Sequence, residues 1–405
     1  MHTQAQQQMH TLLQAFYQQG GSDLFITAGA PASQRTDGAI EAMTAQNLSS
    51  QQAKTLTLAL MNEQQQTRFA QNKEANFAYR LGDKARFRVN AFYQQGQVGC
   101  VIRRIATEIP SAQSLKLPEV LTQLVMEKRG LILMVGATGS GKSTSLAAMI
   151  GHRNQQSAGH IITIEDPVEF VHPHQKSLVT QREVGVDTPS FESALENTLR
   201  QAPDVILLGE IRSLETMAHA INFAETGHLC LSTLHANNAN QALDRIINFF
   251  PQEKRDQVLM DLSLNLKAIV SQRLIPTANG GRVAAIEILI NTPYIADLIF
   301  KGQVHDIKTA MEKSQTPDIQ TFDQALFDLY EAEKISYEDA LRNADAVNDL
   351  RLKIKLDSSR PLPDSLAQDA TPLNLKDDPA THETSDQAAQ NPSHPQTPDA
   401  DTPTS

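Results

Sequence analysis

The chain has 405 residues, which is long enough for two domains that each bury a hydrophobic core. Its formal net charge of -11 at pH 7 disfavours a nucleic-acid motor or a polybasic membrane binder, so we expect no nucleic-acid partner. The first residues show neither the basic nor the apolar region of a signal peptide, and no apolar run reaches the length of about eighteen residues that a membrane-spanning helix needs. These features predict a cytoplasmic protein.

Residues 1–108 are expected to form a small α+β domain. Short apolar runs and turn residues predict a strand at 23–28, a helix at 50–71, and strands at 75–81, 85–94 and 97–105, with hairpin turns at Gly82-Asp83 and Gln95-Gly96. In the run 85–94, apolar Phe87 and Val89 alternate with Arg86 and Arg88. Since successive side chains of a strand point to opposite faces, this strand is predicted to have one apolar and one basic face.

Residues 109–120 contain Pro110 and Pro118 among polar residues, which is typical of a linker. In residues 121–356, short apolar runs alternate with helical patterns, and this alternation predicts a parallel sheet flanked by helices.

The end of this second domain is predicted to be helical. We expect an amphipathic helix at 253–274 and further helices at 321–333 and 337–344, the last with Ser336 and Asp339 as a capping pair. Residues 357–405 have very few large apolar side chains, so they are predicted to form a disordered acidic tail.

Residues 136–143 match the phosphate-binding pattern G-x-x-x-x-G-K-[ST]. Glycine allows backbone N–H groups to surround phosphates, Lys142 brings a positive charge to the terminal phosphates, and Ser143 offers a hydroxyl group to Mg²⁺. An apolar strand at 131–135 and a helix at 144–150 flank the loop, which distinguishes it from an ordinary glycine-rich turn. The sequence therefore predicts ATP and Mg²⁺ as ligands, with nucleotide contacts from Gly136, Thr138, Gly139, Ser140, Gly141, Lys142, Ser143 and Thr144.

Acidic residues follow two further apolar runs. The run 205–208 ends at Gly209-Glu210, and the run 161–164 is followed by Glu165, Asp166 and Glu169. A carboxylate at the end of a strand beside the phosphate-loop strand is well placed to organise Mg²⁺ or to orient the attacking water. The expected metal-organising residues are Ser143, Glu165, Asp166 and Glu210. Acidic residues thus recur at the ends of successive strands after the phosphate loop. This pattern favours a RecA-like motor core over a nucleotide kinase, whose fold is interrupted by a lid.

A predicted strand at 227–235 has His228 at one end and His235 at the other. Taken alone, these histidines predict no function, because a histidine beside a strand is more often structural than catalytic. Neither they nor the two cysteines, Cys100 and Cys230, have the spacing of a zinc site. We therefore expect no zinc and two buried, reduced thiols.

Together, four segments resemble the motifs of the secretion ATPase superfamily, the motors of type II secretion and type IV pili. They are the phosphate loop, Thr-Ile-Glu-Asp-Pro-Val-Glu at 163–169, Leu-Leu-Gly-Glu-Ile-Arg at 207–212, and Glu-Thr-Gly-His…Ser-Thr-Leu-His at 225–235. The resemblance runs from about residue 22 to residue 356 and points to the PilT/PilU branch, which retracts pili in twitching motility. Longer runs that begin at His160, Gln181, Ala239 and Asp349 resemble PilU-type members.

The resemblance implies a PAS-like N-terminal domain and a RecA-like ATPase domain in a homo-hexamer at the inner-membrane face of the pilus machine. The implied partners are a principal pilus retraction ATPase and an inner-membrane platform protein. The implied roles are general base for Glu169, organiser of Mg²⁺ and water for Glu210, coupling of the γ-phosphate to movement for His228 and His235, and contacts with a neighbouring subunit's nucleotide for Arg88, Arg103 and Arg104.

Two departures from the retraction pattern bear on function. Ser213 stands where the family usually has aspartate, and residues 295–302 lack the arginines of the matching PilT helix. The sequence therefore predicts an ATP-hydrolysing retraction motor that acts as an accessory to a principal motor.

One alternative is a nucleotide-binding regulatory subunit. Another is a pilus assembly or type II secretion motor, which this chain's two cysteines disfavour because those motors carry a four-cysteine zinc module.

Overall fold

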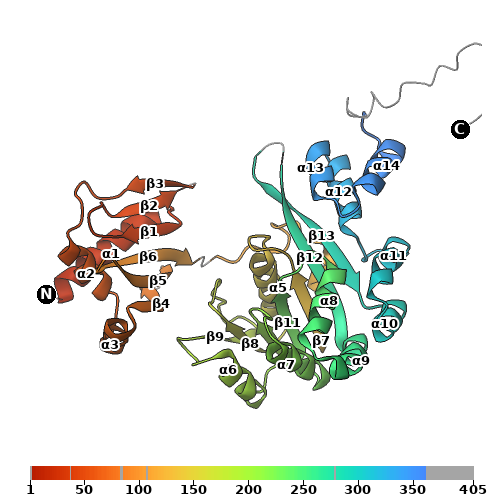
Figure 1. Ribbon diagram of the computed structural model, residues 1–405, viewed down its shortest axis with the longest axis horizontal. Helices are drawn as coiled ribbons and strands as arrows, with labels where there is room; N and C mark the ends of the chain where they lie inside the picture. The colour runs from red at the N-terminus through yellow and green to blue at the C-terminus, as the bar shows by residue number, and fades with distance from the viewer. Residues whose placement is uncertain (1, 37, 83–84, 106–107, 278–279, 362–405) are drawn as a thin grey trace, which may run out of the picture. The chain divides into compact units, whose positions relative to one another are not determined.

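The structure is a computed structural model that describes residues 2–36, 38–82, 85–105, 108–277 and 280–361. It is an α/β protein with one six-stranded sheet near the N-terminus and one seven-stranded sheet after it (Figure 1). In these ranges, no helix combines the length and the apolar character needed to cross a membrane.

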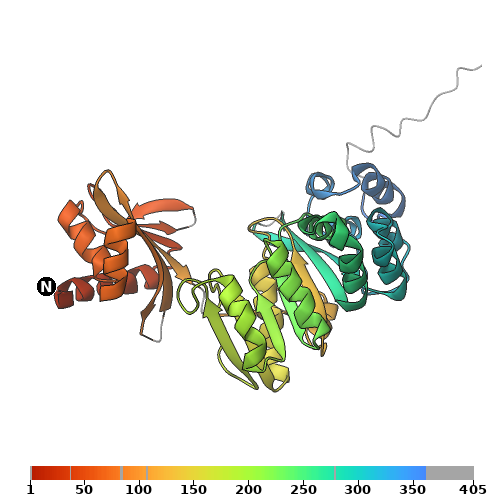
Figure 2. The same cartoon turned by 60° about the horizontal axis from the view of Figure 1, so that its bottom comes forward.

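The N-terminal sheet has the strand order β3-β2-β1-β6-β5-β4, and every neighbouring pair is antiparallel. Helices gather on one face of this sheet (Figure 2) and contribute Met9, Phe16 and Phe69 to its core. The elements are α1 (His2–Gln18), β1 (Asp23–Ile26), β2 (Ser33–Thr36), β3 (Ala39–Ala42), α2 (Ser50–Leu58), α3 (Glu63–Asn72), β4 (Glu74–Leu81), β5 (Ala85–Gln94) and β6 (Gln97–Ile105).

Several predictions for this region are confirmed. The three strand-like runs are β4, β5 and β6, and along β5 the apolar residues Phe87 and Val89 are buried while Arg86 and Arg88 are only partly buried. The Gln95-Gly96 turn joins β5 to β6, whereas Asp83 of the other predicted turn lies outside the described residues.

Three other features of this region differ from the prediction. The prediction of a single helix at 50–71 is wrong, because helix α2 ends and a second helix, α3, begins a few residues later. The Asn62 side chain accepts a hydrogen bond from the Gln65 backbone and so caps the start of α3. The glutamine-rich helix α1, the strand β2 and the edge strand β3 were not predicted.

The second sheet has the order β13-β12-β7-β11-β10-β8-β9, with β12 and β13 antiparallel and the other neighbours parallel. Helices cover both of its faces, as the two views in Figures 1 and 2 show. Its strands are β7 (Gly130–Val135), β8 (Gly159–Glu165), β9 (Ser177–Glu183), β10 (Val205–Leu208), β11 (Leu229–Leu234), β12 (Leu266–Pro276) and β13 (Arg282–Ile290). Its helices are α4 (Glu119–Leu124), α5 (Lys142–Gln156), α6 (Phe191–Thr198), α7 (Leu214–Glu225), α8 (Ala239–Phe249), α9 (Arg255–Asn265), α10 (Pro293–Phe300) and α11 (Ile307–Glu312).

Burial on both faces explains the apolar runs in this domain. Every residue of β7 is buried, with Leu131 and Leu133 in one hydrophobic cluster and Ile132 and Met134 in the other. A strand between two helical layers has no polar face, which confirms the predicted sheet with helices on both sides.

The long helix predicted at 253–274 is wrong. Helix α9 ends at Asn265, and the next eleven residues form β12, which pairs with β7 on one side and β13 on the other. Leu262, Leu266 and Ile269 do have helical spacing, but Ala268, Ile269 and Val270 are all fully buried. A short apolar run of this kind fits a strand buried on both faces as well as a buried helix, so spacing alone could not decide.

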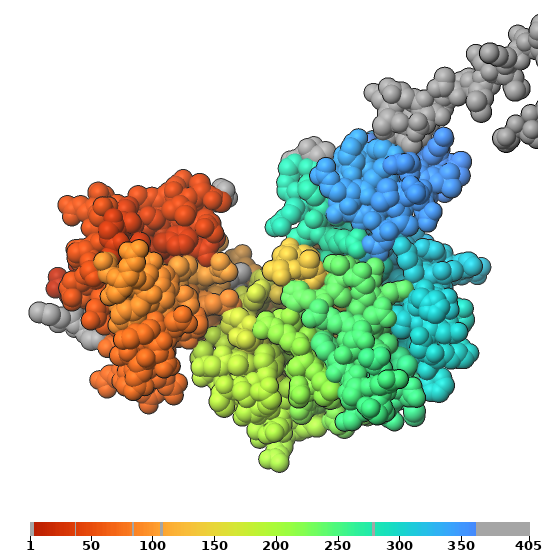
Figure 3. Space-filling model, viewed as in Figure 1, coloured from red at the N-terminus to blue at the C-terminus, as the bar shows by residue number. Residues whose placement is uncertain are grey.

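The chain then forms α12 (Phe322–Glu331), α13 (Tyr337–Asn343) and α14 (Val347–Asp357). Of these helices, blue in Figure 3, α12 and α13 pack directly against the teal β12–β13 hairpin. The predicted capping pair is confirmed, since the Ser336 side chain accepts a hydrogen bond from the Asp339 backbone at 3.0 Å.

The tail was predicted to begin at residue 357, and this boundary needs correction. Ser358 and Ser359 donate hydrogen bonds to the carboxylate of Glu331, and the Arg360 guanidinium lies 4.2 Å from the centre of the Tyr330 ring. Contacts with α12 therefore extend to Arg360. Residues 362–405 of the predicted tail lie outside the described residues.

Candidate functional site

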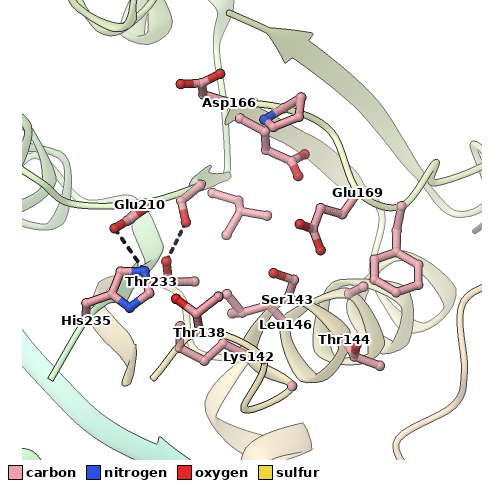
Figure 4. A pocket seen from close by; sticks show the side chains of 18 of the residues that line it. Thr138, Lys142, Ser143, Thr144, Leu146, Asp166, Glu169, Glu210, Thr233 and His235 are labelled. Carbon is pink, nitrogen blue, oxygen red and sulfur yellow. Dashed lines mark hydrogen bonds and ion pairs between the residues drawn. The ribbon is translucent and has the colours of Figure 1, made fainter. Parts of the chain in front are cut away.

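A pocket of 460 Å³ lies at the carboxyl ends of β7, β8, β10 and β11 (Figure 4). Parallel strands bring their carboxyl ends to one edge of a sheet, so loops that are far apart in sequence meet there. The lining residues include Thr138, Gly139, Gly141, Lys142, Ser143 and Thr144 after β7, Glu165, Asp166 and Glu169 after β8, Glu210 and Arg212 after β10, and Thr233 and His235 at the end of β11.

The loop between β7 and α5 has a backbone shape suited to phosphate. Gly136 has a φ of 153°, and a Cβ there would lie 2.6 Å from the carbonyl oxygen of Gln272, so a side chain does not fit. Gly141 has a φ of 89°, in the left-handed region that glycine adopts without strain. Helix α5 begins directly afterwards at Lys142, so its unpaired N–H groups and the positive end of its dipole face the loop.

Lys142 is buried, and its ammonium group is held by its own loop. It donates hydrogen bonds to the carbonyl oxygens of Gly136 at 2.8 Å and Ala137 at 2.9 Å. Burial lowers the pKa of Lys142, while the carboxylates of Glu210 and Glu169 act in the opposite direction. Because loop carbonyls are weaker partners than phosphate oxygens, this ammonium group is ready to exchange them for an anion.

Glu210 is fixed between two cationic or protonatable partners. Its Oε2 lies 2.6 Å from a guanidinium nitrogen of Arg212, and its Oε1 lies 3.2 Å from Nε2 of His235. The hydrogen bond to Glu210 raises the pKa of Arg212. Since Glu210 follows β10 and His235 follows β11, this contact joins the ends of two neighbouring strands at the pocket (Figure 4).

The three acids after β8 have different environments. Glu169 is exposed, and Figure 4 shows its carboxylate directed across the pocket toward Ser143. Glu165 accepts hydrogen bonds from the Thr163 hydroxyl at 2.6 Å and the Gln181 amide at 3.3 Å, and burial raises its pKa. Asp166 is exposed and lies 4.0 Å from Arg212. Glu169 is therefore well placed to reach a ligand, whereas Glu165 is engaged in the pocket wall.

The structure does not bring His228 to the pocket. It precedes β11, and its Nδ1 lies 3.2 Å from the carbonyl oxygen of Phe223 and 3.1 Å from the Thr226 hydroxyl. The six residues of β11 separate it from His235 by roughly 20 Å along the strand. A role for His228 at the γ-phosphate of its own chain's pocket does not fit this position, because a strand's two ends lie at opposite edges of the sheet.

The three arginines of the N-terminal domain do not line the pocket either. Arg103 is held by Asp23 at 2.8 Å, the Arg104 guanidinium lies 5.8 Å from the centre of the Tyr17 ring, and Arg88 is partly buried on β5. Their predicted contact with the nucleotide of a neighbouring subunit stays a prediction. Ser140 and Gly136 belong to the phosphate loop but do not line this pocket, and the Ser140 hydroxyl is buried.

Some residues of the site were not predicted. Arg212 and Thr233 line the pocket, and both stand inside the motif segments at 207–212 and 225–235, so the sequence carries a signal for them. Gln272 supports the loop from behind: its Oε1 accepts a hydrogen bond from the Ser145 hydroxyl at 2.8 Å. The two residues are 127 positions apart, and no local pattern marks such a contact. Cys100 and Cys230 are both buried free thiols, as expected.

Comparison with known proteins agrees with this geometry. The family model described as "Type II/IV secretion system protein" matches residues 2–281. The chain belongs to this family. It is 60% identical to the type IV pilus ATPase PilU of Pseudomonas aeruginosa over 373 residues, which cover 91% of this chain and 97% of that relative. It is 42% identical to the PilT retraction ATPase of the same organism, over 80% of this chain and 95% of PilT.

Solved structures give the same assignment. The crystal structure of the pilus retraction motor PilT with bound ADP has a TM-score of 0.80 and 40% identity, covering 85% of this chain and 98% of PilT. The DotB ATPase of Legionella pneumophila has a TM-score of 0.72 and 27% identity, covering 81% of this chain and 92% of DotB. The predicted P-loop ATPase fold and the resemblance to the retraction branch are confirmed, including the greater similarity to PilU than to PilT.

Proposed function

We propose that the chain binds ATP with Mg²⁺ in this pocket, hydrolyses it, and uses the cycle to power type IV pilus retraction. The observation that carries the proposal is the convergence of Lys142, Ser143, Glu169, Glu210 and His235 on one pocket from four separate strand ends. Relatives named for the pilus ATPases PilU and PilT, and a PilT structure with bound ADP, support the nucleotide and the cellular role.

Each side chain has a role that follows from its position. Lys142 and the loop N–H groups bind the phosphates, and Ser143 and Glu210 hold Mg²⁺, which neutralises charge on the phosphates. Within the described ranges no group of three or more His, Cys, Asp and Glu residues is arranged to hold a metal alone. Phosphate oxygens and water molecules complete the octahedral shell of Mg²⁺. Glu169, facing Ser143 across the pocket, accepts the proton of the attacking water. Asp166 adds negative charge at the same edge.

The proposed working form is a homo-hexamer at the cytoplasmic face of the inner membrane, in contact with a platform protein of the pilus. Arg88, Arg103 and Arg104 contact nucleotide across the subunit boundary in this assembly. Mg²⁺-dependent phosphate release by the purified chain, measured together with its mass in solution, tests the proposal. Nucleotide binding without turnover would instead indicate a regulatory subunit.

Helix α10 favours an accessory role beside a principal retraction ATPase. At the end of this helix Lys301 is paired with Asp297 at 2.7 Å, and Phe300 is 56% exposed. The matching PilT helix carries arginines, which make forked, bidentate contacts. A lysine whose charge is paired with a neighbouring aspartate does not reproduce such contacts. An intact nucleotide site combined with this helix predicts a motor that hydrolyses ATP and couples weakly to the pilus base alone.

A genetic experiment tests the accessory role. The principal retraction ATPase is deleted while this protein is kept at its normal level, and labelled pili are followed under light load. We expect retraction to become rare. Retraction at the parental frequency would show that this chain is a self-sufficient motor.

A further inference from the structure

Strand β12 lies directly behind the phosphate loop. Gln272 is 3% exposed, its side chain accepts the hydrogen bond from Ser145 of α5, and its carbonyl oxygen closes the space beside Gly136. Successive residues of a strand face opposite ways, so Arg273 points away from α5. Two consecutive residues of β12 are thus held by different parts of the domain.

Arg273 joins the C-terminal helices to the segment that follows His235. Its guanidinium donates to the Asp345 carboxylate at 2.6 Å, to the Asn343 carbonyl at 2.6 Å and to the Asn237 carbonyl at 3.2 Å. It also lies 3.9 Å from the centre of the Phe322 ring, on α12. The ion pair between Arg273 and Asp345 is largely removed from water, since their side chains are 23% and 13% exposed. Its geometry is therefore well defined.

Asp345 makes a second contact with the same segment. Its other carboxylate oxygen accepts a hydrogen bond from the Asn238 amide at 3.1 Å, and Asn238 caps the start of α8. At the next residue, the backbone N–H of Ala239 donates to the buried carboxylate of Glu287 at 2.8 Å, and that carboxylate also accepts from the Ser271 hydroxyl. Residues 237–239 are therefore held at three successive positions by β12, β13 and the loop before α14.

This segment begins two residues after His235, which contacts Glu210 at the pocket. A movement of His235 when the terminal phosphate is present or absent can reach Asn237 through two residues of backbone. Asn237 accepts a hydrogen bond from Arg273, so the movement is passed to the charged Arg273–Asp345 pair.

We propose that Arg273 and Asp345 are a positioning pair that transmits the nucleotide state of the pocket to helices α12–α14. The inference rests on the proposed ATPase function, since it requires a nucleotide-dependent movement at His235. It assigns the C-terminal helices as the part of the domain that responds to the pocket, and neither Arg273 nor Asp345 lines that pocket.

The test uses the full chain and three variants. Arg273→Lys keeps the charge and loses the fork, Asp345→Asn keeps the side-chain shape, and Arg360→Lys is the matched control. Arg360 also stacks on a ring of α12 and donates to a carbonyl of that helix, at Tyr330, but among the described residues no contact joins it to residues 237–239. The measurements are hydrogen exchange over residues 337–357 with Mg²⁺-ADP and with a non-hydrolysable ATP analogue, nucleotide affinity, kcat and KM, and the melting temperature.

In the parent, we expect exchange over residues 337–357 to differ between the two nucleotides. In Arg273→Lys and Asp345→Asn we expect this difference to shrink and kcat to fall by roughly 2- to 30-fold, with nucleotide affinity unchanged. Arg360→Lys should keep both. If one of the two pair variants, Arg273→Lys or Asp345→Asn, does not fold, the test rests on the other.

Three results would overturn the proposal. The first is a parent that binds both nucleotides with identical exchange in these helices. The second is either pair variant with parental exchange and turnover. The third is an equal fall of kcat in Arg360→Lys, which would indicate a general loss of stability. A parent that binds no nucleotide would overturn the proposed function itself, and the transmission with it.

Discussion

Lys142 and its glycine loop are the residues whose role the sequence predicts most directly. The geometry adds that the ammonium group is buried and donates to the carbonyls of Gly136 and Ala137, so Lys142 itself helps to hold the loop. Because this arrangement lies at the pocket and outside both hydrophobic clusters of the domain, binding and folding should respond separately to its removal.

We expect Lys142→Ala to abolish ATP binding while the melting temperature stays within a few degrees of the parent. The reason is the loss of the charge that contacts the terminal phosphates. Nucleotide affinity and thermal unfolding are measured side by side, with the exposed Lys128→Ala as control. Binding at the parental affinity would show that this loop is not the phosphate site.

We expect Glu169→Gln and Glu210→Gln to bind ATP and to turn it over roughly 10²–10⁴-fold more slowly. Each change removes a carboxylate that acts on the attacking water or on Mg²⁺ while it keeps the side-chain shape. Single-turnover hydrolysis checks this, with the exposed Glu196→Gln as control. Parental rates in both variants would place the hydrolytic groups elsewhere.

Strands β12 and β13 and the start of helix α8 meet at a buried acid, Glu287. It is 3% exposed, and burial raises its pKa to about 7, with Asp345 adding to the shift and Arg273 opposing it. The folded chain thus keeps this proton up to about pH 7, whereas an unfolded carboxyl group loses it near its ordinary value of 4.5. Between these values the folded state binds more protons, so stability falls as pH rises.

Glu287→Gln should remove this pH dependence. The amide oxygen still accepts from Ala239 and Ser271, and no charge forms above pH 7. Between about pH 5 and about pH 8, the parent should lose up to roughly 3 kcal/mol more unfolding free energy than the variant. Denaturant titrations at both pH values measure this difference. Parallel losses in the two proteins would mean that Glu287 does not titrate in this range.

The chain combines two sheets and their helices with a C-terminal segment of different composition. Arg360 is the last residue whose contacts with the domain are described, through Tyr330. Residues 362–405 lie outside the described residues, and their sequence contains few large apolar side chains.

Truncation after Arg360 should leave the melting temperature and the ATPase rate unchanged. Truncation after Leu356 also removes the Arg360–Tyr330 contact, and a fall of about 2–4 °C in melting temperature is expected. The two truncated proteins differ only in residues 357–360, so each is the control for the other. A large loss of stability in the longer one would show that residues 361–405 contribute to the fold.

The sequence was sufficient wherever chemistry or periodicity is local. The phosphate loop, the acids at strand ends, the hairpin strands β4–β6 and the Ser336 cap all depend on residues within a few positions of one another, and each was predicted. Where a run fits two structures equally well, local information fails: the apolar residues after Asn265 fit a helix until β7 and β13 are present to pair with them. Long-range contacts decided the rest. The opposite ends of β11 separate His228 from His235, and the contacts of Gln272 and Arg273 join segments that are 127 and 72 residues apart in the chain. Such contacts form only when packing brings distant segments together, because no property of either segment alone specifies its partner.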